Sequence, residues 1–182
     1  MGNLGKWDPW YRFVTEEQPY GDTRTYELGA AYLADCERIE DWGCGKGWLR
    51  RYMARQRYRG IDASKTPFVD EIADLARYRS RVEGIFLRHV LEHDWEWAEI
   101  LRNAVTSFTK KLFVVIFTPF SQDGTKEIAY AIDMGVPDIS FQYEDIVRNF
   151  EGLEWRAETL ETDTQYGTET VFYVEKPPPS VA

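Results

Sequence analysis

The sequence predicts a single α/β domain whose sheet is parallel at its centre and antiparallel at one edge. Three observations predict this fold. Segments with the character of short strands and helices alternate from residue 38 to residue 117, as in domains built on a parallel sheet. The run Leu112–Phe117 is continuously apolar, which is typical of a strand buried on both faces of such a sheet. Two β-like runs, Glu154–Leu160 and Thr170–Glu175, then form a terminal hairpin.

The elements before residue 90 are short, and each follows from local spacing. Apolar residues that fall on one side of a helix predict helices over Thr25–Cys36 and Trp48–Ala54. Strands are predicted between and after these helices, over Arg38–Trp42, Tyr58–Ile61, Val69–Ala73 and Gly84–Leu87.

A longer helix is expected over Trp95–Phe108, where apolar residues recur at helical spacing. Asp94 is placed to cap this helix, and Glu96 is favourable in its first turn because acidic side chains complement the positive end of the helix dipole. A further short helix is expected around Glu144–Phe150, before the terminal hairpin.

The length and composition fit one packed domain. The chain has 182 residues, of which 43% are hydrophobic and 15% aromatic. At about 150 residues per domain this length corresponds to a single unit, and the composition argues against a disordered chain. The domain is expected to span residues 1–182, with residues 1–36 as an aromatic and helical cap and residues 177–182 as a frayed, disordered tail.

The charge balance and the cysteines limit the class of protein. The chain has 22 Lys and Arg against 31 Asp and Glu, a net charge of −9, which disfavours a broad basic face for nucleic acid. Its apolar runs are too short to span a membrane, and no secretory signal is visible. Cys36 and Cys44 do not form a disulfide framework, and reduced thiols fit a cytoplasmic protein.

The most informative motif is the glycine loop Asp41-Trp42-Gly43-Cys44-Gly45-Lys46-Gly47 between a predicted strand and a predicted helix. Glycines permit a sharp turn and let a ligand approach the main chain. Trp48 stands where the nicotinamide fingerprint needs its third glycine, and no Gly-Lys-Ser/Thr follows as in a phosphate-binding P-loop. The acid at the start of the loop, Asp41, suits a ligand with a cationic head.

Two more acids follow predicted strands. Asp62 comes about twenty residues after the loop, where an α/β nucleotide fold places a carboxylate on ribose hydroxyls. Asp74 follows the next strand and could meet an adenine amino group. Since parallel strands end at the same edge of the sheet, we expect Asp41, Asp62 and Asp74 to lie on one ligand-binding edge.

With these residues the chain resembles the class I S-adenosylmethionine-dependent methyltransferases, from about Arg38 to Phe120 and more loosely to the terminal hairpin. The resemblance implies a doubly wound, mostly parallel seven-stranded sheet with a C-terminal antiparallel hairpin, and S-adenosylmethionine as cofactor. One departure is Glu83-Gly84, where the family's fourth strand usually begins with Phe-Asp. The cofactor contacts that the resemblance implies are Asp41, Gly43, Cys44, Gly45, Gly47, Asp62, Ala63, Asp74, Leu75, Arg88 and His89.

The segment Leu87–His93 resembles the family's stretch beside the methyl group and carries both histidines of the chain. His93 is the best candidate for a general base because its ordinary pKa is near neutrality, and His89 is second. A structural role, in which Glu92 and His93 buttress the loop by hydrogen bonds, is an equal alternative. The same residues spell the inverted zincin pattern H-x-x-E-H, but they fall at a predicted strand end without a further ligand, so no metal site is expected.

The predicted function is methyl transfer from S-adenosylmethionine to an oxygen or nitrogen nucleophile of a small-molecule or sugar-like acceptor. The alternative is a non-catalytic cofactor-binding or scaffold module of the same fold. A nucleic-acid or protein methyltransferase is less favoured, because the Asn/Asp-Pro-Pro-aromatic motif of amino-methylating DNA enzymes is absent after the fourth strand. A local arginine group (Arg50, Arg51, Arg55, Arg57 and Arg59) is expected to form a solvated face.

Two segments are expected to select the acceptor, because the chain has no inserted domain. The first is the aromatic N-terminal stretch with Trp7, Trp10, Tyr11 and Tyr20, of which one or two residues should line the cleft. The second is the connection Thr118–Pro137.

Overall fold

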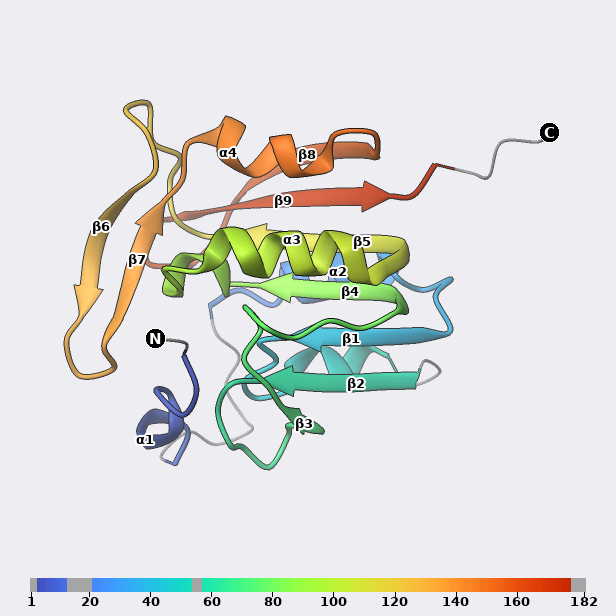
Figure 1. The fold of residues 1–182 in the computed structure, drawn as a ribbon, viewed down its shortest axis with the longest axis horizontal. Coiled ribbons are helices and arrows are strands. Elements are labelled where there is room, and N and C mark those ends of the chain that lie inside the picture. Colours follow the sequence, from blue (N-terminus) through green and yellow to red (C-terminus); the bar gives the residue numbers. More distant parts are fainter. Residues whose placement is uncertain (1–2, 13–20, 54–56, 178–182) are drawn as a thin grey trace.

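The computed structural model describes residues 3–12, 21–53 and 57–177 as an α/β domain around a seven-stranded sheet (Figure 1). The strand order is β3-β2-β1-β4-β5-β9-β8. The pairs among the first five of these strands are parallel, and β9 is antiparallel to both of its neighbours. The predicted fold is therefore confirmed. The strands are β1 (Arg38–Trp42), β2 (Arg57–Asp62), β3 (Glu71–Ile72), β4 (Val82–Arg88), β5 (Phe108–Ile116), β8 (Glu154–Glu161) and β9 (Thr168–Glu175).

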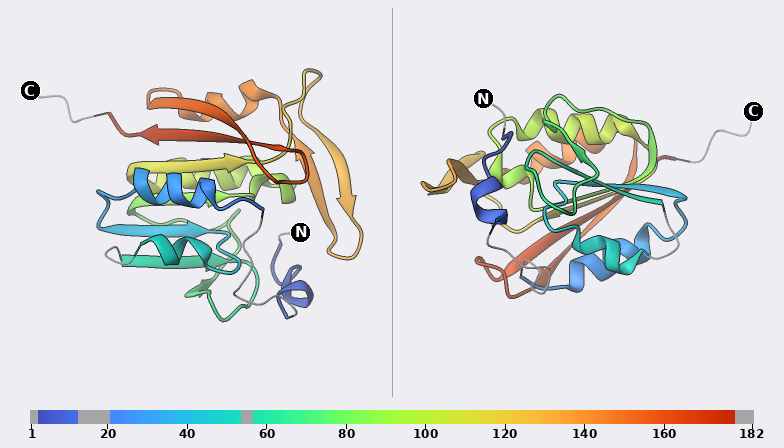
Figure 2. Two further views of the ribbon diagram at one scale, coloured as in Figure 1. Left: turned by 180° about the vertical axis from the view of Figure 1, so that it is seen from behind. Right: turned by 90° about the horizontal axis from the view of Figure 1, so that it is seen from below.

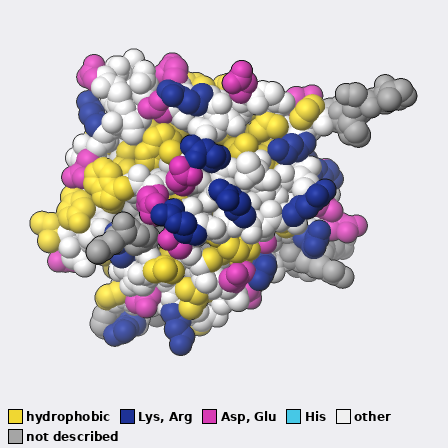
Figure 3. Space-filling view, in the orientation of Figure 1, with side chains coloured by type: hydrophobic (Ala, Val, Ile, Leu, Met, Phe, Trp, Pro, Cys, Tyr) yellow, Lys and Arg dark blue, Asp and Glu magenta, His cyan; other side chains and the backbone are white. Residues whose placement is uncertain are grey.

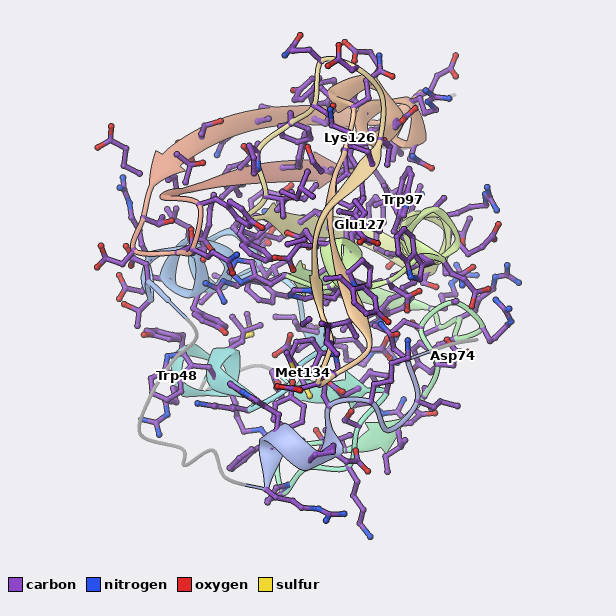
Figure 4. All side chains as sticks on the ribbon, turned by 90° about the vertical axis from the view of Figure 1, so that its left-hand side faces the viewer. Trp48, Asp74, Trp97, Lys126, Glu127 and Met134 are labelled. Carbon is purple, nitrogen blue, oxygen red and sulfur yellow. The ribbon has the colours of Figure 1, made fainter. Side chains whose placement is uncertain are left out.

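Helices cover both faces of the sheet (Figures 1 and 2). On one face lie α2 (Arg24–Tyr32) and the 3-10 helix η1 (Trp48–Tyr52). On the other lie α3 (Trp97–Ser107), α4 (Tyr143–Val147) and the 3-10 helix η3 (Arg148–Phe150). Figure 4, which looks along the strands, shows Trp48 and Trp97 on opposite sides.

The central strands supply both cores because successive side chains of a strand point to opposite faces. In β5, Leu112 and Val114 pack in the core under α3, whereas Phe113 and Val115 pack in the core under α2. The continuous apolar run of the sequence is thus a strand buried on both faces, as predicted.

The predicted ends of several elements differ from those observed. The expected strand Val69–Ala73 pairs with β2 only over Glu71–Ile72. Within the helix expected over Trp48–Ala54, Trp48–Tyr52 form the 3-10 helix η1, which starts after the left-handed Gly47, and Ala54 lies outside the described residues. α3 begins at Trp97, and Asp94 caps the turn before it, since its Oδ1 accepts the Glu96 N–H at 2.8 Å.

Three features were not predicted from the sequence. They are α1 (Asp8–Tyr11), the 3-10 helix η2 (Leu91–His93), and a separate hairpin of β6 (Lys126–Ala131) and β7 (Val136–Ser140). The hairpin stands at the carboxyl ends of β4 and β5 (Figure 1), and hydrophobic side chains gather over it in Figure 3. Pro137 argues against a strand, but β7 pairs on one side only, and a proline is tolerated in such an edge strand.

The N-terminal residues form a strap across the carboxyl edge of the sheet. Gly5 N–H donates to the Ala63 carbonyl at 2.9 Å, at the end of β2. Lys6 Nζ donates to the Gly135 carbonyl at 3.1 Å, in the turn of the β6–β7 hairpin. The strap therefore joins two elements that stand on either side of the carboxyl edge. The cap expected over residues 1–36 stays a prediction: its described residues include the strap and α2, and Tyr20 lies outside the described residues.

Two of the five arginines expected on a solvated face have acidic partners. Arg50 pairs with Asp70 at 2.8 Å, and Arg59 pairs with Glu71 at 2.5 Å. Arg55 lies outside the described residues, as do residues 178–182 of the tail expected over residues 177–182.

Cys36 and Cys44 are buried and free. Among the described helices, none has the length and apolar character needed to cross a membrane.

The packing of Gly29 in α2 against the sheet gives a first testable prediction. A Cβ atom on Gly29 of α2 would lie 2.3 Å from Phe86 Cε2, and the Phe86 ring is fixed by stacking on Phe113 at 5.4 Å. We expect Gly29→Ala to lower the free energy of unfolding by about 1–3 kcal/mol through overpacking, although alanine favours a helix by about 1 kcal/mol. Urea denaturation measures this, with the exposed Ala31→Ser as control. A stabilised Gly29→Ala protein would contradict the described packing.

Candidate functional site

A cavity of about 410 Å³ opens at the carboxyl edge of the sheet, beneath the N-terminal strap. This volume is within the range of small-molecule sites. Nine of the residues predicted for the site line it: Gly43, Cys44, Asp62, Ala63, Asp74, Leu75, Arg88, His89 and His93. The other three predicted residues, Asp41, Gly45 and Gly47, lie behind the wall and shape the loop.

The glycine loop is held in a conformation that favours glycine. Gly43, Gly45 and Gly47 have φ angles of 72°, 48° and 61°, in the left-handed region that residues with a Cβ rarely adopt. A Cβ on Gly43 would lie 2.2 Å from Val90 Cγ2, and one on Gly45 would lie 2.7 Å from the hydroxyl of Tyr11. The glycine spacing seen in the sequence therefore reflects a tight turn. This turn packs against α1 at Gly45 and against the segment after β4 at Gly43.

Asp62 fastens this loop to the end of β2. Its Oδ2 accepts the Gly45 N–H at 2.8 Å, and its Oδ1 accepts the Ser64 N–H at 2.8 Å. Burial raises the pKa of Asp62 to about 6, although these backbone hydrogen bonds act in the opposite direction. A carboxylate has about four lone-pair sites, so the oxygens on the cavity wall keep capacity for a ligand's donors.

Asp41 lies under the loop and not on the cavity wall. Its Oδ2 accepts the Tyr58 hydroxyl at 2.7 Å. Burial raises the pKa of Asp41 to about 7, against the effect of that hydrogen bond. The strand that contains Asp41, β1, thus brings this residue close to the loop. A direct contact between Asp41 and a ligand stays a prediction.

Asp74 and Leu75 form the wall beyond β3. Asp74 Oδ1 accepts the Ala76 N–H at 3.0 Å, which closes a turn of the kind that aspartate favours. Leu75 is buried beside it, and Ile100 of α3 lines the same cavity. This part of the cavity is an apolar slot with an acid at its edge.

Arg88 and His89 belong to a buried polar network at the end of β4. Arg88 Nη2 pairs with Glu169 of β9 at 2.8 Å, and Arg88 Nε donates to Thr25 of α2 at 2.8 Å. His89 has a φ of 55°, and its Nε2 lies 2.5 Å from the same Glu169 carboxylate. Burial and the Arg88 cation lower the pKa of His89. The neutral imidazole therefore donates its Nε2–H to Glu169.

His93 lies on the 3-10 helix η2 (Leu91–His93), and its ring is bound on one side only. Its Nδ1 is 3.0 Å from the Pro137 carbonyl and 3.2 Å from Asp138 Oδ1, both in β7. In the neutral ring, two oxygen acceptors at Nδ1 place the proton there, so Nε2 carries the lone pair of the neutral form. Nε2 has no hydrogen-bond partner within residues 3–12, 21–53 and 57–177.

The charge on His93 is set by opposing effects. Burial lowers the pKa of His93, but the Asp138 hydrogen bond and the Glu92 charge outweigh burial and raise it overall. The His93 hydrogen bond holds the pKa of Asp138 below its usual value. The other Asp138 oxygen accepts the Tyr166 hydroxyl at 2.9 Å. The structure thus forms a chain from Tyr166 through Asp138 to His93.

Glu92 supports the loop after β5. Its Oε1 accepts the Phe117 N–H at 2.7 Å, and its Oε2 is buried without a partner in the described part of the chain. Burial raises the pKa of Glu92 to about 7. Glu92 makes the kind of loop hydrogen bond that the structural alternative expected. Within the described residues, no group of three or more His, Cys, Asp or Glu side chains could hold a metal ion.

Sequence reasoning missed several residues of this site. Asp138, Tyr166 and Glu169 come from strands or turns far along the chain, so no local spacing relates them to Leu87–His93. The aromatic N-terminal segment contributes more than expected, since Trp7, Trp10 and Tyr11 all line the cavity. The Thr118–Pro137 connection contributes Ala131, Met134 and Val136.

Comparison with known proteins identifies the fold. No protein-family model matches the sequence, and no curated protein does either. A 1,6-didemethyltoxoflavin-N1-methyltransferase of Burkholderia thailandensis, with bound 1,6-didemethyltoxoflavin and S-adenosylhomocysteine, matches with a TM-score of 0.66 and 13% identity over 94% of this chain and 82% of that chain. Magnesium protoporphyrin IX methyltransferase of Synechocystis PCC 6803, with bound S-adenosylhomocysteine, matches with a TM-score of 0.66 and 16% identity over 94% of each chain.

Proteins that carry out more than one kind of reaction share this fold. The [4+2]-cyclase SpnF matches with a TM-score of 0.64 and 15% identity over 85% of this chain and 80% of that chain. At such identities the likenesses show the fold alone. The chain has the fold of the class I S-adenosylmethionine-dependent methyltransferases, as its sequence resemblance implied, and its function rests on the site.

The buried carboxyl of Glu92 predicts a pH dependence of stability. Its pKa in the folded protein, about 7, exceeds its ordinary value of 4.5, so the native state keeps a proton that the unfolded chain releases. Stability attributable to this group is therefore present below about pH 4.5 and falls as pH rises to about 7, by about 3 kcal/mol at most.

Glu92→Gln keeps an oxygen for the Phe117 N–H and removes the titration. We expect urea denaturation at pH 5 and pH 8 to show a smaller stability difference for Glu92→Gln than for the unmodified protein. Glu99→Gln, a change on the partly exposed face of α3, serves as control. An unchanged difference in the Glu92→Gln protein would contradict the raised pKa.

Proposed function

We propose that the protein is an enzyme that transfers the methyl group of S-adenosylmethionine to an oxygen or nitrogen nucleophile of a small-molecule or sugar-like acceptor. One observation carries this proposal. The glycine loop after β1, Asp62 after β2 and Asp74 after β3 line one cavity at the carboxyl edge of a parallel sheet, which is where α/β folds bind nucleotides. Two of the neighbours in fold hold S-adenosylhomocysteine.

The residues on the wall fit this cofactor. Asp62 offers carboxylate oxygens to ribose hydroxyls, and the slot beside Leu75 offers apolar walls to adenine with Asp74 near the amino group. Gly43 has no side chain to obstruct a ligand that passes over the loop. The acids on the wall, which include Asp94 and Asp138, favour a ligand with a sulfonium and an ammonium charge.

S-adenosylmethionine, when bound, supplies a methyl group that is already activated for displacement. The residues of the chain then have three tasks: to align the acceptor, to exclude water, and to remove a proton where the acceptor must lose one. The strap with Trp7 covers the cavity. His93 is the proposed general base in its neutral form, in which Nδ1 donates to β7 and Nε2 carries the lone pair.

Cofactor binding tests the proposal directly. We expect S-adenosylmethionine and S-adenosylhomocysteine to bind the intact protein in isothermal titration. Asp62→Ala should weaken both about ten- to hundredfold, because it removes hydrogen bonds from a charged acceptor and releases the glycine loop.

Two further variants separate this effect from misfolding. Asp74→Ala leaves the glycine loop untouched and is also expected to weaken binding. Asp35→Ala, at the opposite edge of the sheet beside Lys110, should bind like the intact protein. If the intact protein binds neither compound, the proposed function is wrong.

The role of His93 gives a separate prediction. We expect His93→Ala to lower turnover about a hundredfold or more, the usual contribution of a general base, while cofactor affinity stays nearly unchanged. Turnover is measured as release of S-adenosylhomocysteine with an acceptor found by screening. Equal turnover of the variant would remove His93 from the mechanism and leave it a structural role.

A further inference from the structure

Part of the cavity is not accounted for by the proposed cofactor contacts. Its wall comes from the strap, from the loops after β4 and β5, and from the β6–β7 and β8–β9 turns. Its lining includes Trp7, His93, Phe117, Met134, Val136 and Thr164, beside the acids Asp138 and Asp163. The first six of these residues are mostly aromatic and apolar, and we call them the acceptor wall.

The rings of the acceptor wall are in mutual contact around His93. The His93 ring lies 5.2 Å from the Trp7 ring and 5.4 Å from the Phe117 ring, measured between centroids. Phe117 also contacts the His89 ring at 4.7 Å and the Tyr166 ring at 5.7 Å. Aromatic surfaces of this kind bind flat apolar rings by stacked and edge-to-face contacts. Met134 and Val136 extend the same apolar surface, with Met134 at the tip of the β6–β7 hairpin (Figure 4).

The charges around the wall disfavour an anion. Asp138 and Asp163 line this part of the cavity. The guanidinium of Arg88 is held by the buried Glu169 carboxylate at 2.8 Å. No lysine lines the cavity in the part of the chain that the structure describes. A phosphate or carboxylate bound here would be desolvated among acids, which is costly without a cation to pair with it.

We propose that the acceptor is a flat aromatic or heteroaromatic compound that carries an acidic O–H or N–H and no phosphate or carboxylate. This inference rests on the proposed function. His93 Nε2 takes the acceptor's proton, the oxygen or nitrogen forms a bond to the methyl carbon, and the carbon–sulfur bond breaks with its electron pair left on sulfur. Asp138, a positioning residue, stabilises the imidazolium through Nδ1, and Tyr166 orients Asp138.

The groups that face the His93 ring come from several elements. Asp138 of β7 and Glu92 of η2 are the acids, and His89 lies across Phe117. Trp7 packs on the ring, and the Asn3 side-chain amide donates to the His93 carbonyl. A change at Asp138 therefore alters the charge at Nδ1 without removing any part of the acceptor wall.

The test uses two dyes that differ by one charge. 7-Hydroxycoumarin and 7-hydroxycoumarin-3-carboxylate are titrated into the protein loaded with S-adenosylhomocysteine, with methyl β-glucoside as a non-aromatic comparison. We expect 7-hydroxycoumarin to bind about tenfold more tightly than the carboxylate, because burying an unpaired charge is costly. We expect the glucoside not to bind. Equal or tighter binding of the carboxylate, binding of the glucoside alone, or binding of none of the three would overturn the proposal.

Two variants, with Met134→Leu as a control, locate the dye. Met134→Lys places a cation on the acceptor wall and should abolish or reverse the preference against the carboxylate, whereas Met134→Leu should keep it. Asp138→Asn should lower the phenolate fraction of bound 7-hydroxycoumarin, which is read from its absorption spectrum. A Met134→Lys protein with an unchanged preference, or an Asp138→Asn protein with an unchanged phenolate fraction, would contradict the proposed placement.

The outcomes for the acceptor and for the cofactor are distinguishable. Titration with S-adenosylhomocysteine precedes the dyes, and a protein that binds it but fails the dye test refutes the acceptor class alone. A protein that does not bind S-adenosylhomocysteine refutes the proposed function.

Discussion

The parallel direction of β1 to β5 is the constraint on which the rest of the structure depends. Each of these strands delivers the chain to the same edge of the sheet, so that edge collects loops whose backbone N–H groups need partners. Carboxylates at the strand ends supply them: Asp62 binds the N–H groups of Gly45 and Ser64, and Glu92 binds that of Phe117. The acids that shape the loops therefore also set the character of the cavity, which is acidic near the glycine loop and aromatic near His93.

The buried pair of Arg88 and Glu169 has a different part in the same edge. It joins β4, β9 and the first turn of α2, because the guanidinium also donates to Thr25. Removing one member of such a pair leaves an unpaired charge in the interior, which is far more costly than the pair is stabilising. The pair also affects the geometry of the site, because Glu169 contacts the His89 ring. The backbone of His89 is in the left-handed region.

The sequence was sufficient for the features that depend on neighbouring residues. The apolar run that became β5, the glycine loop and the acids after β2 and β3 follow from short spacings. It was not sufficient for features that depend on distant pairs. Asp138 contacts His93 from a hairpin strand that contains Pro137, and the alternation in β6 is weak because β6 is largely exposed. Glu169 and Thr25 meet only because β9 returns beside β5 under α2. The strap was expected to be aromatic, but its contact with Ala63 has no local signal.

The positions of the two ends of the described chain have a practical consequence for handling the protein. The strap brings residue 3 beside His93, whose carbonyl accepts the Asn3 side-chain amide at 2.8 Å. β9 runs antiparallel to β5 and pairs Glu175 with Lys111, so it ends at the opposite edge of the sheet. In Figure 1 the two ends accordingly lie far apart. An affinity tag or fluorescent fusion attached before the strap would crowd the mouth of the cavity, whereas the same group attached after β9 would leave the cavity open to ligands.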